Sequence, residues 1–231
     1  MAACSANYIY RNGGAEITAV EKNERPARKL MITGKGRCNV CNNCDIDTLI
    51  ANIPENGRFL YSAFSGFAPQ DTMTFFESLG VPLKTERGNR VFPVSDKAAD
   101  IADALVKAAK RGGTKIIHGR AKKILTENGA VSGVLLENGE TLPADSVILA
   151  TGGMSYPLTG STGDGYKMAR ALGHTVAEIK PSLVALNAHE GFCERLAGLS
   201  LKNVTLSVFE EGKKKPVFSE LGEMLFTHFG I

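Results

Sequence analysis

The stretch Gly13-Gly14-Ala15-Glu16-Ile17-Thr18-Ala19-Val20-Glu21-Lys22-Asn23 decides the expected fold, together with the later loop Thr33-Gly34-Lys35-Gly36-Arg37-Cys38-Asn39. The first stretch predicts a buried strand from Ala15 to Val20 that ends in an acid. The second is a basic loop whose spaced glycines let backbone N–H groups face an anion. Together they predict a nucleotide held across the edge of a parallel sheet, with its ribose on Glu21 and its phosphates near the loop.

The composition limits the classes of protein that the chain can belong to. Its 231 residues are 43% hydrophobic, which suffices for one large domain or two small ones with a real core. The formal net charge of +3 suits an anionic small molecule and is too weak to indicate a nucleic acid. No signal peptide and no membrane-spanning run is present, so we expect no membrane partner.

The five cysteines are an odd number, and three of them are clustered at Cys38, Cys41 and Cys44. A disulfide framework is therefore not expected, and a reducing cytoplasm is the predicted location. The Cys-x-x-Cys-x-x-Cys spacing also has a metal-binding interpretation, but an iron–sulfur site needs a fourth ligand, and no Cys-Pro follows. We predict no metal site and keep a cysteine-cluster metal module as the weakest alternative.

The elements at the start of the chain come in an unusual order. Residues 1–11 predict a helix that ends at Asn12-Gly13-Gly14, and a strand follows it. Because a parallel βαβ unit needs a strand before its helix, the chain is expected to begin inside such a unit.

Capping residues and periodicity predict further elements. Pro69 is placed for the first turn of a helix that runs to Ser78. Short strands are expected on both sides of the Arg87-Gly88-Asn89 turn. Ser95 is expected to cap the next helix, which buries Ile101 and other apolar residues on one face.

Antiparallel strands are expected after that helix. Strands at 121–126 and 131–136 are joined by Asn128-Gly129, which is a strong hairpin signal. The apolar run Ser146-Val147-Ile148-Leu149-Ala150 predicts a strand buried on both faces of the parallel sheet. The fold class is therefore α/β: a Rossmann-like, dinucleotide-binding parallel sheet with an antiparallel β-meander.

The pattern changes after Pro181 to short strand-like pieces and a Lys-Lys-Lys-Pro turn. We predict a dinucleotide-binding domain over residues 1–181 and the start of a β-rich domain over residues 182–231.

Each candidate binding residue has a functional and an ordinary interpretation. Glu21 at the end of a strand suits ribose hydroxyls, but it is also a typical solvated acid, and the usual Gly-x-Gly-x-x-Gly turn is missing. Lys35 and Arg37 beside Gly36 suit a pyrophosphate or a flavin edge, or a solvated basic turn. Thr151-Gly152-Gly153 lets a ligand approach the backbone closely, or is a plain strand-to-loop turn. For Asp164, at the start of an expected helix, the ordinary interpretation is preferred.

Six motifs match one family in order. They are Glu21-Lys22-Asn23, Leu30 to Val40, Asn89-Arg90-Val91-Phe92-Pro93-Val94-Ser95-Asp96, Ala150-Thr151-Gly152-Gly153, Gly160-Ser161-Thr162-Gly163-Asp164-Gly165, and Gly222 to Gly230. On these motifs the chain resembles the BaiN-like (aminoacetone-oxidase-type) FAD-dependent oxidoreductases from end to end. The resemblance implies a glutathione-reductase-type FAD-binding core and an inserted β-rich domain that begins near residue 182.

The resemblance also implies roles for individual residues. The implied cofactor-binding residues are Glu21, Lys22, Lys35, Gly36, Arg37, Cys38, Asn39, Ala121, Ala150, Thr151 and Gly152. Glu21 would take the adenosine ribose, residues 36–39 would lie along the pyrophosphate and flavin, and Ala121 would meet the adenine through its backbone. The family's first strand and phosphate turn would lie upstream of Met1, and its C-terminal part after Ile231, so a fragment is expected.

The predicted function is an FAD-dependent oxidoreductase that transfers hydride through flavin N5, with NAD(P)H as reductant and a small organic substrate such as an enone or amine. Arg90, Tyr156 and His228 are the candidate residues on the substrate side. A noncatalytic nucleotide-binding fragment of such an enzyme is the alternative. The sequence predicts neither the substrate nor the oligomeric state.

Overall fold

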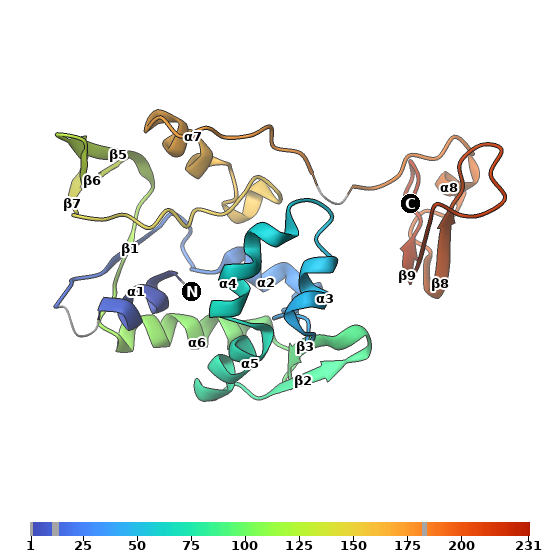
Figure 1. The fold of residues 1–231 in the computed structure, drawn as a ribbon, viewed down its shortest axis with the longest axis horizontal. Helices are drawn as coiled ribbons and strands as arrows, with labels where there is room; N and C mark the ends of the chain where they lie inside the picture. Colours follow the sequence, from blue (N-terminus) through green and yellow to red (C-terminus); the bar gives the residue numbers. More distant parts are fainter. Residues whose placement is uncertain (1, 11–13, 182–183) are drawn as a thin grey trace. The chain divides into compact units, whose positions relative to one another are not determined.

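The computed structural model describes residues 2–10, 14–181 and 184–231. The chain divides into two compact units, residues 1–177 and residues 178–231, which are described separately below (Figure 1). The expected boundary after Pro181 falls at residues 182–183, outside the described residues, as do Asn12 and Gly13 of the expected helix stop. The assignment of the two domains to cofactor binding and to an insertion stays a prediction.

A parallel pair of strands supports the first unit. Strand β1 (Thr18–Glu21) pairs in parallel with β4 (Lys115–His118), so that Glu21 lies opposite His118 where both strands end. Helix α6 (Ala98–Arg111) leads directly into β4, as the crossover of a parallel unit requires. The expected α/β arrangement is therefore present, with β1 starting three residues later than Ala15.

Helix α6 is the centre of the core. Its Ile101 is fully buried and its Ala98 and Ala102 are 1% exposed, because apolar residues recur along one helical face. The same hydrophobic cluster contains Cys38, Phe76 and Val81 from other segments. The helix begins at Ala98, and Ser95 is not its cap: the Ser95 hydroxyl accepts a hydrogen bond from the backbone N–H of Lys97 at 3.3 Å.

Short helices and one hairpin fill the chain between β1 and α6. Helix α1 precedes β1 at Ala2–Tyr10, and helix α5 (Pro69–Ser78) has the bounds that Pro69 predicted. The hairpin strands β2 (Leu83–Glu86) and β3 (Arg90–Pro93) pair antiparallel around residues 87–89. The remaining α-helices among the described residues of this part are α2 (Arg28–Ile32), α3 (Ile46–Ala51) and α4 (Tyr61–Gly66).

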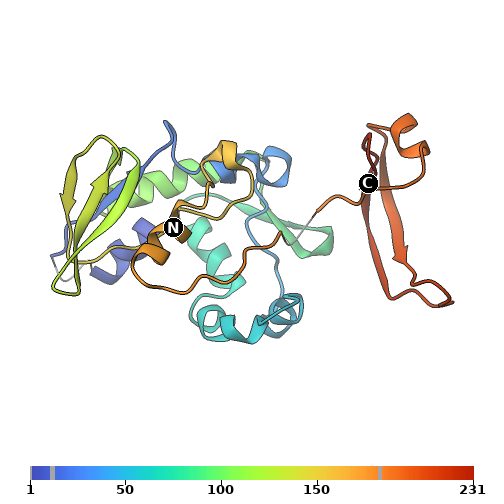
Figure 2. The same cartoon turned by 90° about the horizontal axis from the view of Figure 1, so that it is seen from above.

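The antiparallel meander follows β4, as predicted, and lies at the left of Figure 2. It consists of β5 (Ala121–Glu127), β6 (Ala130–Leu136) and β7 (Thr141–Pro143). Asn128 and Gly129 both have positive φ, at 51° and 81°, which is the turn geometry that makes Asn-Gly a hairpin signal. Helix α7 (Asp164–Ala171) completes the first unit.

The expected buried strand at Ser146–Ala150 is wrong. Residues 146–150 form no strand, and Ile148 and Leu149 are 58% and 40% exposed. A strand needs a neighbour for its backbone hydrogen bonds, and within the described residues the parallel sheet contains only β1 and β4. The apolar run therefore lies outside any strand.

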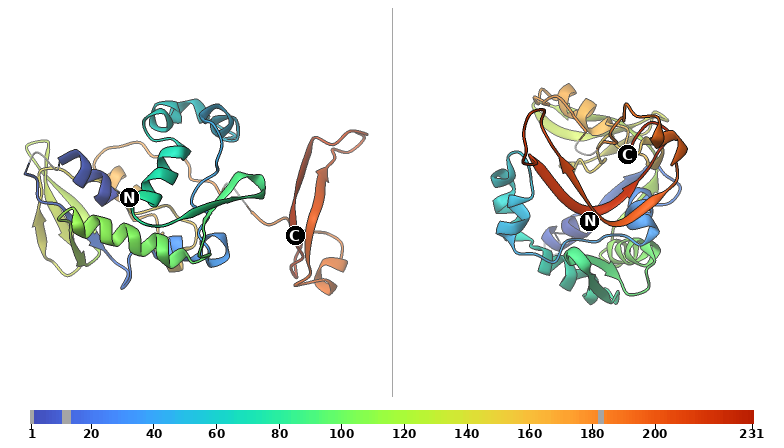
Figure 3. Two further views of the ribbon diagram at one scale, coloured as in Figure 1. Left: turned by 90° about the horizontal axis from the view of Figure 1, so that it is seen from below. Right: turned by 90° about the vertical axis from the view of Figure 1, so that its right-hand side faces the viewer.

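The second unit is a long two-stranded ribbon with a short helix, drawn in orange and red in Figure 3. Strands β8 (Ser200–Val208) and β9 (Phe218–Leu225) pair antiparallel, and α8 spans Phe192–Arg195. Phe226 and Cys193 are buried in this unit, while many apolar residues of the ribbon are exposed.

Candidate functional site

The carboxyl end of the parallel pair carries an oriented carboxylate. Glu21 is the last residue of β1. Its Oε1 accepts two hydrogen bonds from Asn23, one from the backbone N at 2.8 Å and one from Nδ2 at 2.9 Å. Both bonds converge on Oε1, and among the described residues Oε2 has no hydrogen-bond partner, so it can accept a hydrogen bond from a ligand hydroxyl.

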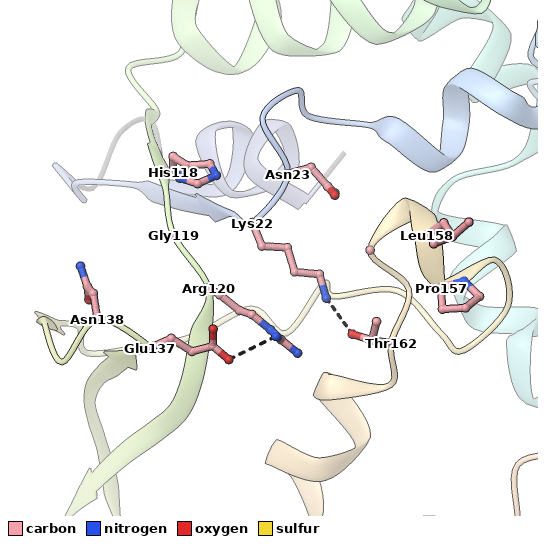
Figure 4. Close-up of a pocket in the computed structure, with 11 residues that line it drawn as sticks. Lys22, Asn23, His118, Gly119, Arg120, Glu137, Asn138, Pro157, Leu158 and Thr162 are labelled. Atoms are coloured by element: carbon pink, nitrogen blue, oxygen red, sulfur yellow. Dashed lines mark hydrogen bonds and ion pairs between the residues drawn. The ribbon is translucent and has the colours of Figure 1, made fainter.

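A pocket of about 570 Å³ is lined by the two residues that follow Glu21 in the chain, whereas Glu21 itself does not line it (Figure 4). Its walls come from the end of β1, the β4–β5 junction, the end of β6 and the segment before α7. The lining residues are Lys22, Asn23, His118, Gly119, Arg120, Glu137, Asn138, Pro157, Leu158, Gly160 and Thr162. The lining combines polar side chains, several of them hydrogen-bond donors, with an almost equal share of apolar surface.

Asp164 binds two of the cations at this pocket. Lys22 Nζ lies 3.0 Å from Asp164 Oδ2 and 2.8 Å from Thr162 Oγ1, and Arg120 Nη2 lies 3.2 Å from the same Asp164 oxygen. Burial alone would raise the pKa of Asp164, but the hydrogen bonds from Lys22, Thr162 and Arg120 outweigh it and lower the pKa to about 2. The carboxylate is therefore ionised at every ordinary pH.

The glycine loop folds tightly on itself. Gly34, Lys35 and Gly36 all have positive φ, at 56°, 58° and 86°. A Cβ on Gly34 would stand 2.8 Å from the backbone N of Asn39, whereas none would meet an atom within 4 Å at Gly36. Gly34 is thus required by the loop's own packing, and the backbone at Gly36 is open to a ligand.

Arg37 is occupied by the chain itself. Its Nη1 lies 3.0 Å from Glu86 and 3.2 Å from Asp96, and its guanidinium carbon lies 3.9 Å from the centroid of the Phe92 ring. The hydrogen bond from Arg37 lowers the pKa of Glu86, and that from Lys84 lowers the pKa of Asp96. In this structure the cluster ties the glycine loop to the β2–β3 hairpin.

Cys38 belongs to the core. It is 3% exposed, has a φ of 64°, and its pKa is raised by burial. Burial also raises the pKa of Cys41, and all five cysteines are free thiols. Within the described residues, no three side chains among histidine, cysteine, aspartate and glutamate are grouped to hold a metal ion.

The other residues implied to bind the cofactor lie in two places. Ala121 is the first residue of β5, next to Arg120 of the pocket. Ala150, Thr151 and Gly152 lie in the irregular segment that precedes α7, where Gly152 has a φ of 75°. Thr151 Oγ1 occupies the space that a Cβ on Gly165 would need, and Gly152 lies against Ser161.

The three candidate residues on the substrate side are far apart in the sequence. Two of them belong to the first unit and one to the second. Arg90 is exposed, and its Nε donates to the carbonyl of Arg87 at 3.1 Å. Tyr156 is 66% exposed with a φ of 55°, and Lys29 Nζ lies 5.9 Å from its ring centroid. His228 belongs to the second unit and packs edge-on against Phe229. Their roles stay predictions.

Several pocket residues were not predicted from the sequence. His118, Arg120 and Asn138 reach the pocket from strand ends and turns that carry no ligand motif. Asp164 was given an ordinary interpretation, yet it links the β1 end to α7. The signal for it was present, because Gly160-Ser161-Thr162-Gly163-Asp164-Gly165 was one of the matching motifs.

The parallel pair, its crossover helix and the pocket at its carboxyl end define a Rossmann-type α/β domain. Residues 1–228 match the model of the HI0933-like protein Rossmann domain, and the chain belongs to this family. This confirms both the fold class and the resemblance drawn from the motifs.

Relatives with assigned functions extend the comparison. The chain is 33% identical over 221 residues to the 3-dehydro-bile acid delta(4,6)-reductase of Clostridium scindens, which covers 95% of this chain and 52% of that protein. It is 28% identical over 232 residues to the ribosomal RNA dihydrouridine synthase of Escherichia coli K12, which covers 99% and 54%. The chain thus spans about half the length of the curated relatives that it matches.

A solved structure of the Escherichia coli quinol fumarate reductase FrdA shares the fold. It superposes with a TM-score of 0.58 at 18% identity, over 87% of this chain and 41% of that one.

In the described part of the chain, no helix combines the length and the apolar character that crossing a membrane requires.

Proposed function

We propose that this chain is the FAD-binding portion of an oxidoreductase that reduces a carbon–carbon double bond conjugated to a carbonyl group. The observation that carries the proposal is the Glu21 carboxylate at the end of the parallel pair, followed in the chain by two residues that line the pocket, in a chain that belongs to this family. Dinucleotide folds place an acid at this position for the ribose hydroxyls.

The residues present fit the adenosine end of FAD. Glu21 offers Oε2 to a ribose hydroxyl while Asn23 holds Oε1. Lys22 and Asn23, which follow this carboxylate, line the pocket, and Ala121 follows Arg120 of the same lining. The family resemblance places the adenine at Ala121. The open backbone at Gly36 suits a pyrophosphate or the flavin. When bound, FAD supplies hydride transfer through N5, and the protein supplies position and electrostatics.

The names of the relatives suggest the kind of bond that is reduced. A 3-dehydro-bile acid delta(4,6)-reductase acts on double bonds conjugated to a ketone, and a dihydrouridine synthase reduces the double bond of uracil next to its carbonyl. In either case a hydride is added to one carbon and a proton to the other. We infer the same chemistry here, with NAD(P)H as reductant and Arg90, Tyr156 or His228 on the substrate side.

The first candidate substrate is a small enone, and the protein would act in the cytoplasm without a nucleic-acid or membrane partner. The greater identity to the bile acid reductase and the weak net charge of +3 favour it. The second candidate is a uridine of ribosomal RNA, favoured by the match to the dihydrouridine synthase over nearly the whole chain. A nucleotide-binding fragment without turnover of its own is the remaining alternative.

Flavin binding tests the proposal first. The purified chain is incubated with FAD, freed of excess, and examined for bands near roughly 370 and 450 nm, as bound flavin gives. We expect the wild-type chain to retain flavin. In Glu21→Gln the dissociation constant of FAD should rise about tenfold or more, because a charged acceptor strengthens a hydrogen bond by roughly 1–2 kcal/mol. Glu16→Gln, in the chain just before β1, is the matched control and should bind FAD normally.

Turnover then separates the candidates. NAD(P)H oxidation by the flavin-loaded chain is followed with a conjugated enone steroid and, separately, with unmodified ribosomal RNA. Oxidation that depends on the steroid supports the first candidate, and oxidation that depends on RNA supports the second. Flavin binding without either turnover supports the noncatalytic fragment, and failure to bind FAD or ADP contradicts the proposed function.

A further inference from the structure

Residues before and at the start of α7 form hydrogen bonds with the two residues that follow Glu21. Lys22 Nζ binds Thr162 Oγ1 and Asp164 Oδ2, and Asn23 Nδ2 donates to the carbonyl oxygen of Thr159 at 3.2 Å. These contacts join positions separated by 136 to 142 residues in the sequence. Figure 4 shows Lys22 reaching across the pocket to Thr162.

The backbone of the same segment is shaped to Lys22 and Asn23. A Cβ on Gly160 would stand 2.8 Å from Asn23 Nδ2 and 3.1 Å from Lys22 Cε. Gly160 also has a φ of 98°, a conformation that favours glycine. Any larger residue would therefore press on the side chain that orients Glu21.

The charges complete the arrangement. Asp164 is 13% exposed and pairs with Lys22 and with Arg120. Without the Asp164 carboxylate, the ammonium group of Lys22 could pair instead with Glu21, its neighbour in the chain. An ammonium paired with Glu21 would compete with a ribose hydroxyl for the same oxygens.

We propose that Asp164 and Gly160 are positioning residues for the nucleotide: they hold Lys22 and Asn23 so that the Glu21 carboxylate faces the ribose with one oxygen available. Neither residue is assigned a contact with the nucleotide. The inference rests on the proposed function, because it takes Glu21 as the ribose ligand. It predicts that the two residues set recognition of the ribose hydroxyls specifically, rather than binding in general.

The test compares two nucleotides that differ only in those hydroxyls. Dissociation constants of ADP and 2′,3′-dideoxy-ADP are measured by calorimetry on the full 231-residue chain. In the wild-type chain ADP should bind about tenfold or more tightly than the dideoxy nucleotide, as expected of a charge-assisted hydrogen bond. In Asp164→Asn and in Gly160→Ala this ratio should fall to within about twofold of unity.

Matched variants separate positioning from general loss of structure. Asp103→Asn removes the partner of Arg25 in an exposed ion pair, and Gly173→Ala places a Cβ in open space at a similar φ of 88°. Both should keep the wild-type ratio. Gly160→Ala leaves every charge in place, so it carries the test even if Asp164→Asn fails to fold.

The outcomes distinguish failure of the Glu21 assignment from failure of the positioning role of Asp164 and Gly160. A wild-type chain that binds neither nucleotide, or both equally, overturns the assignment of Glu21 and with it this inference. A wild-type chain that discriminates, with Asp164→Asn or Gly160→Ala folded and discriminating equally well, overturns the inference and leaves the proposed function in place.

Discussion

The apolar face of helix α6 and the apolar run at residues 146–150 both belong to the first unit, yet only the helix face is buried. Ile101 of α6 is fully buried, whereas Ile148 is 58% exposed. A helix satisfies its backbone within itself and needs only a face to pack against. A strand needs a neighbour for every hydrogen bond. Apolar sequence is therefore sufficient for burial only where the backbone is already satisfied.

The largest effect is expected from matched truncations in the two segments. Ile101→Ala should destabilise the chain by about 2–5 kcal/mol, because it leaves a cavity in the core. Ile148→Ala should change the free energy of unfolding by no more than about 0.5 kcal/mol, because its side chain is largely solvated. Urea unfolding measures both, and equal losses would show that residues 146–150 are buried in solution.

Hydrogen exchange tests the backbone side of the comparison. The amides of residues 102–111 in α6 should exchange at least about a hundredfold more slowly than those of residues 146–150, because only the former are in a hydrogen-bonded core element. Mass spectrometry of peptides from the two segments measures the difference. Adding FAD should leave the exchange rates of the α6 amides unchanged. Slow exchange at residues 146–150 without a ligand would contradict the structure.

The pH dependence of stability tests whether the chain becomes ordered again at Asp164, after the exposed residues 146–150. The pKa of Asp164 is about 2 in the folded chain and near its ordinary 3.8 when unfolded, so the unfolded state binds the proton first. Its stabilising contribution is complete above about pH 4 and is lost as the pH falls through 2. We expect Asp164→Asn to be less stable than wild type at pH 6 and to approach it near pH 2, as measured by urea unfolding.

Asp103→Asn is the control for that prediction. Its exposed ion pair with Arg25 should contribute little at any pH. A constant difference between wild type and Asp164→Asn from pH 6 to pH 2 would show that the ion pairs of Asp164 do not form in solution.

The smallest expected effect concerns thiols inside and outside the α6 core. Cys38 packs with Ile101 and Leu105, and burial raises its pKa, whereas Cys44 lies outside that cluster. Because the thiolate is the reactive form, Cys38 should be alkylated by iodoacetamide more slowly than Cys44 at pH 8. Peptide mapping of a time course measures both rates, and comparable rates would place Cys38 outside the core.

Much of the local structure followed from residue types. Pro69 predicted the start of α5, Asn128-Gly129 predicted the β5–β6 turn, and the apolar periodicity around Ile101 predicted the buried face of α6. These signals are local, because each depends on dihedral preferences or on a repeat within one element. The family motifs were local in the same sense, and family membership confirmed them.

The partners of those local elements were decided only by the tertiary structure. The run at residues 146–150 reads as a buried strand, and its exposure reflects the lack of a paired neighbour among the described residues. Arg37 was predicted to bind an anion, but it contacts Glu86 and Phe92 of the β2–β3 hairpin and Asp96 just after that hairpin. Glu21 could be predicted from its place at a strand end, whereas the hydrogen bonds from Lys22 to Thr162 and Asp164 and from Asn23 to Thr159 could not. Such contacts join residues far apart in sequence, and no local preference of either partner specifies them.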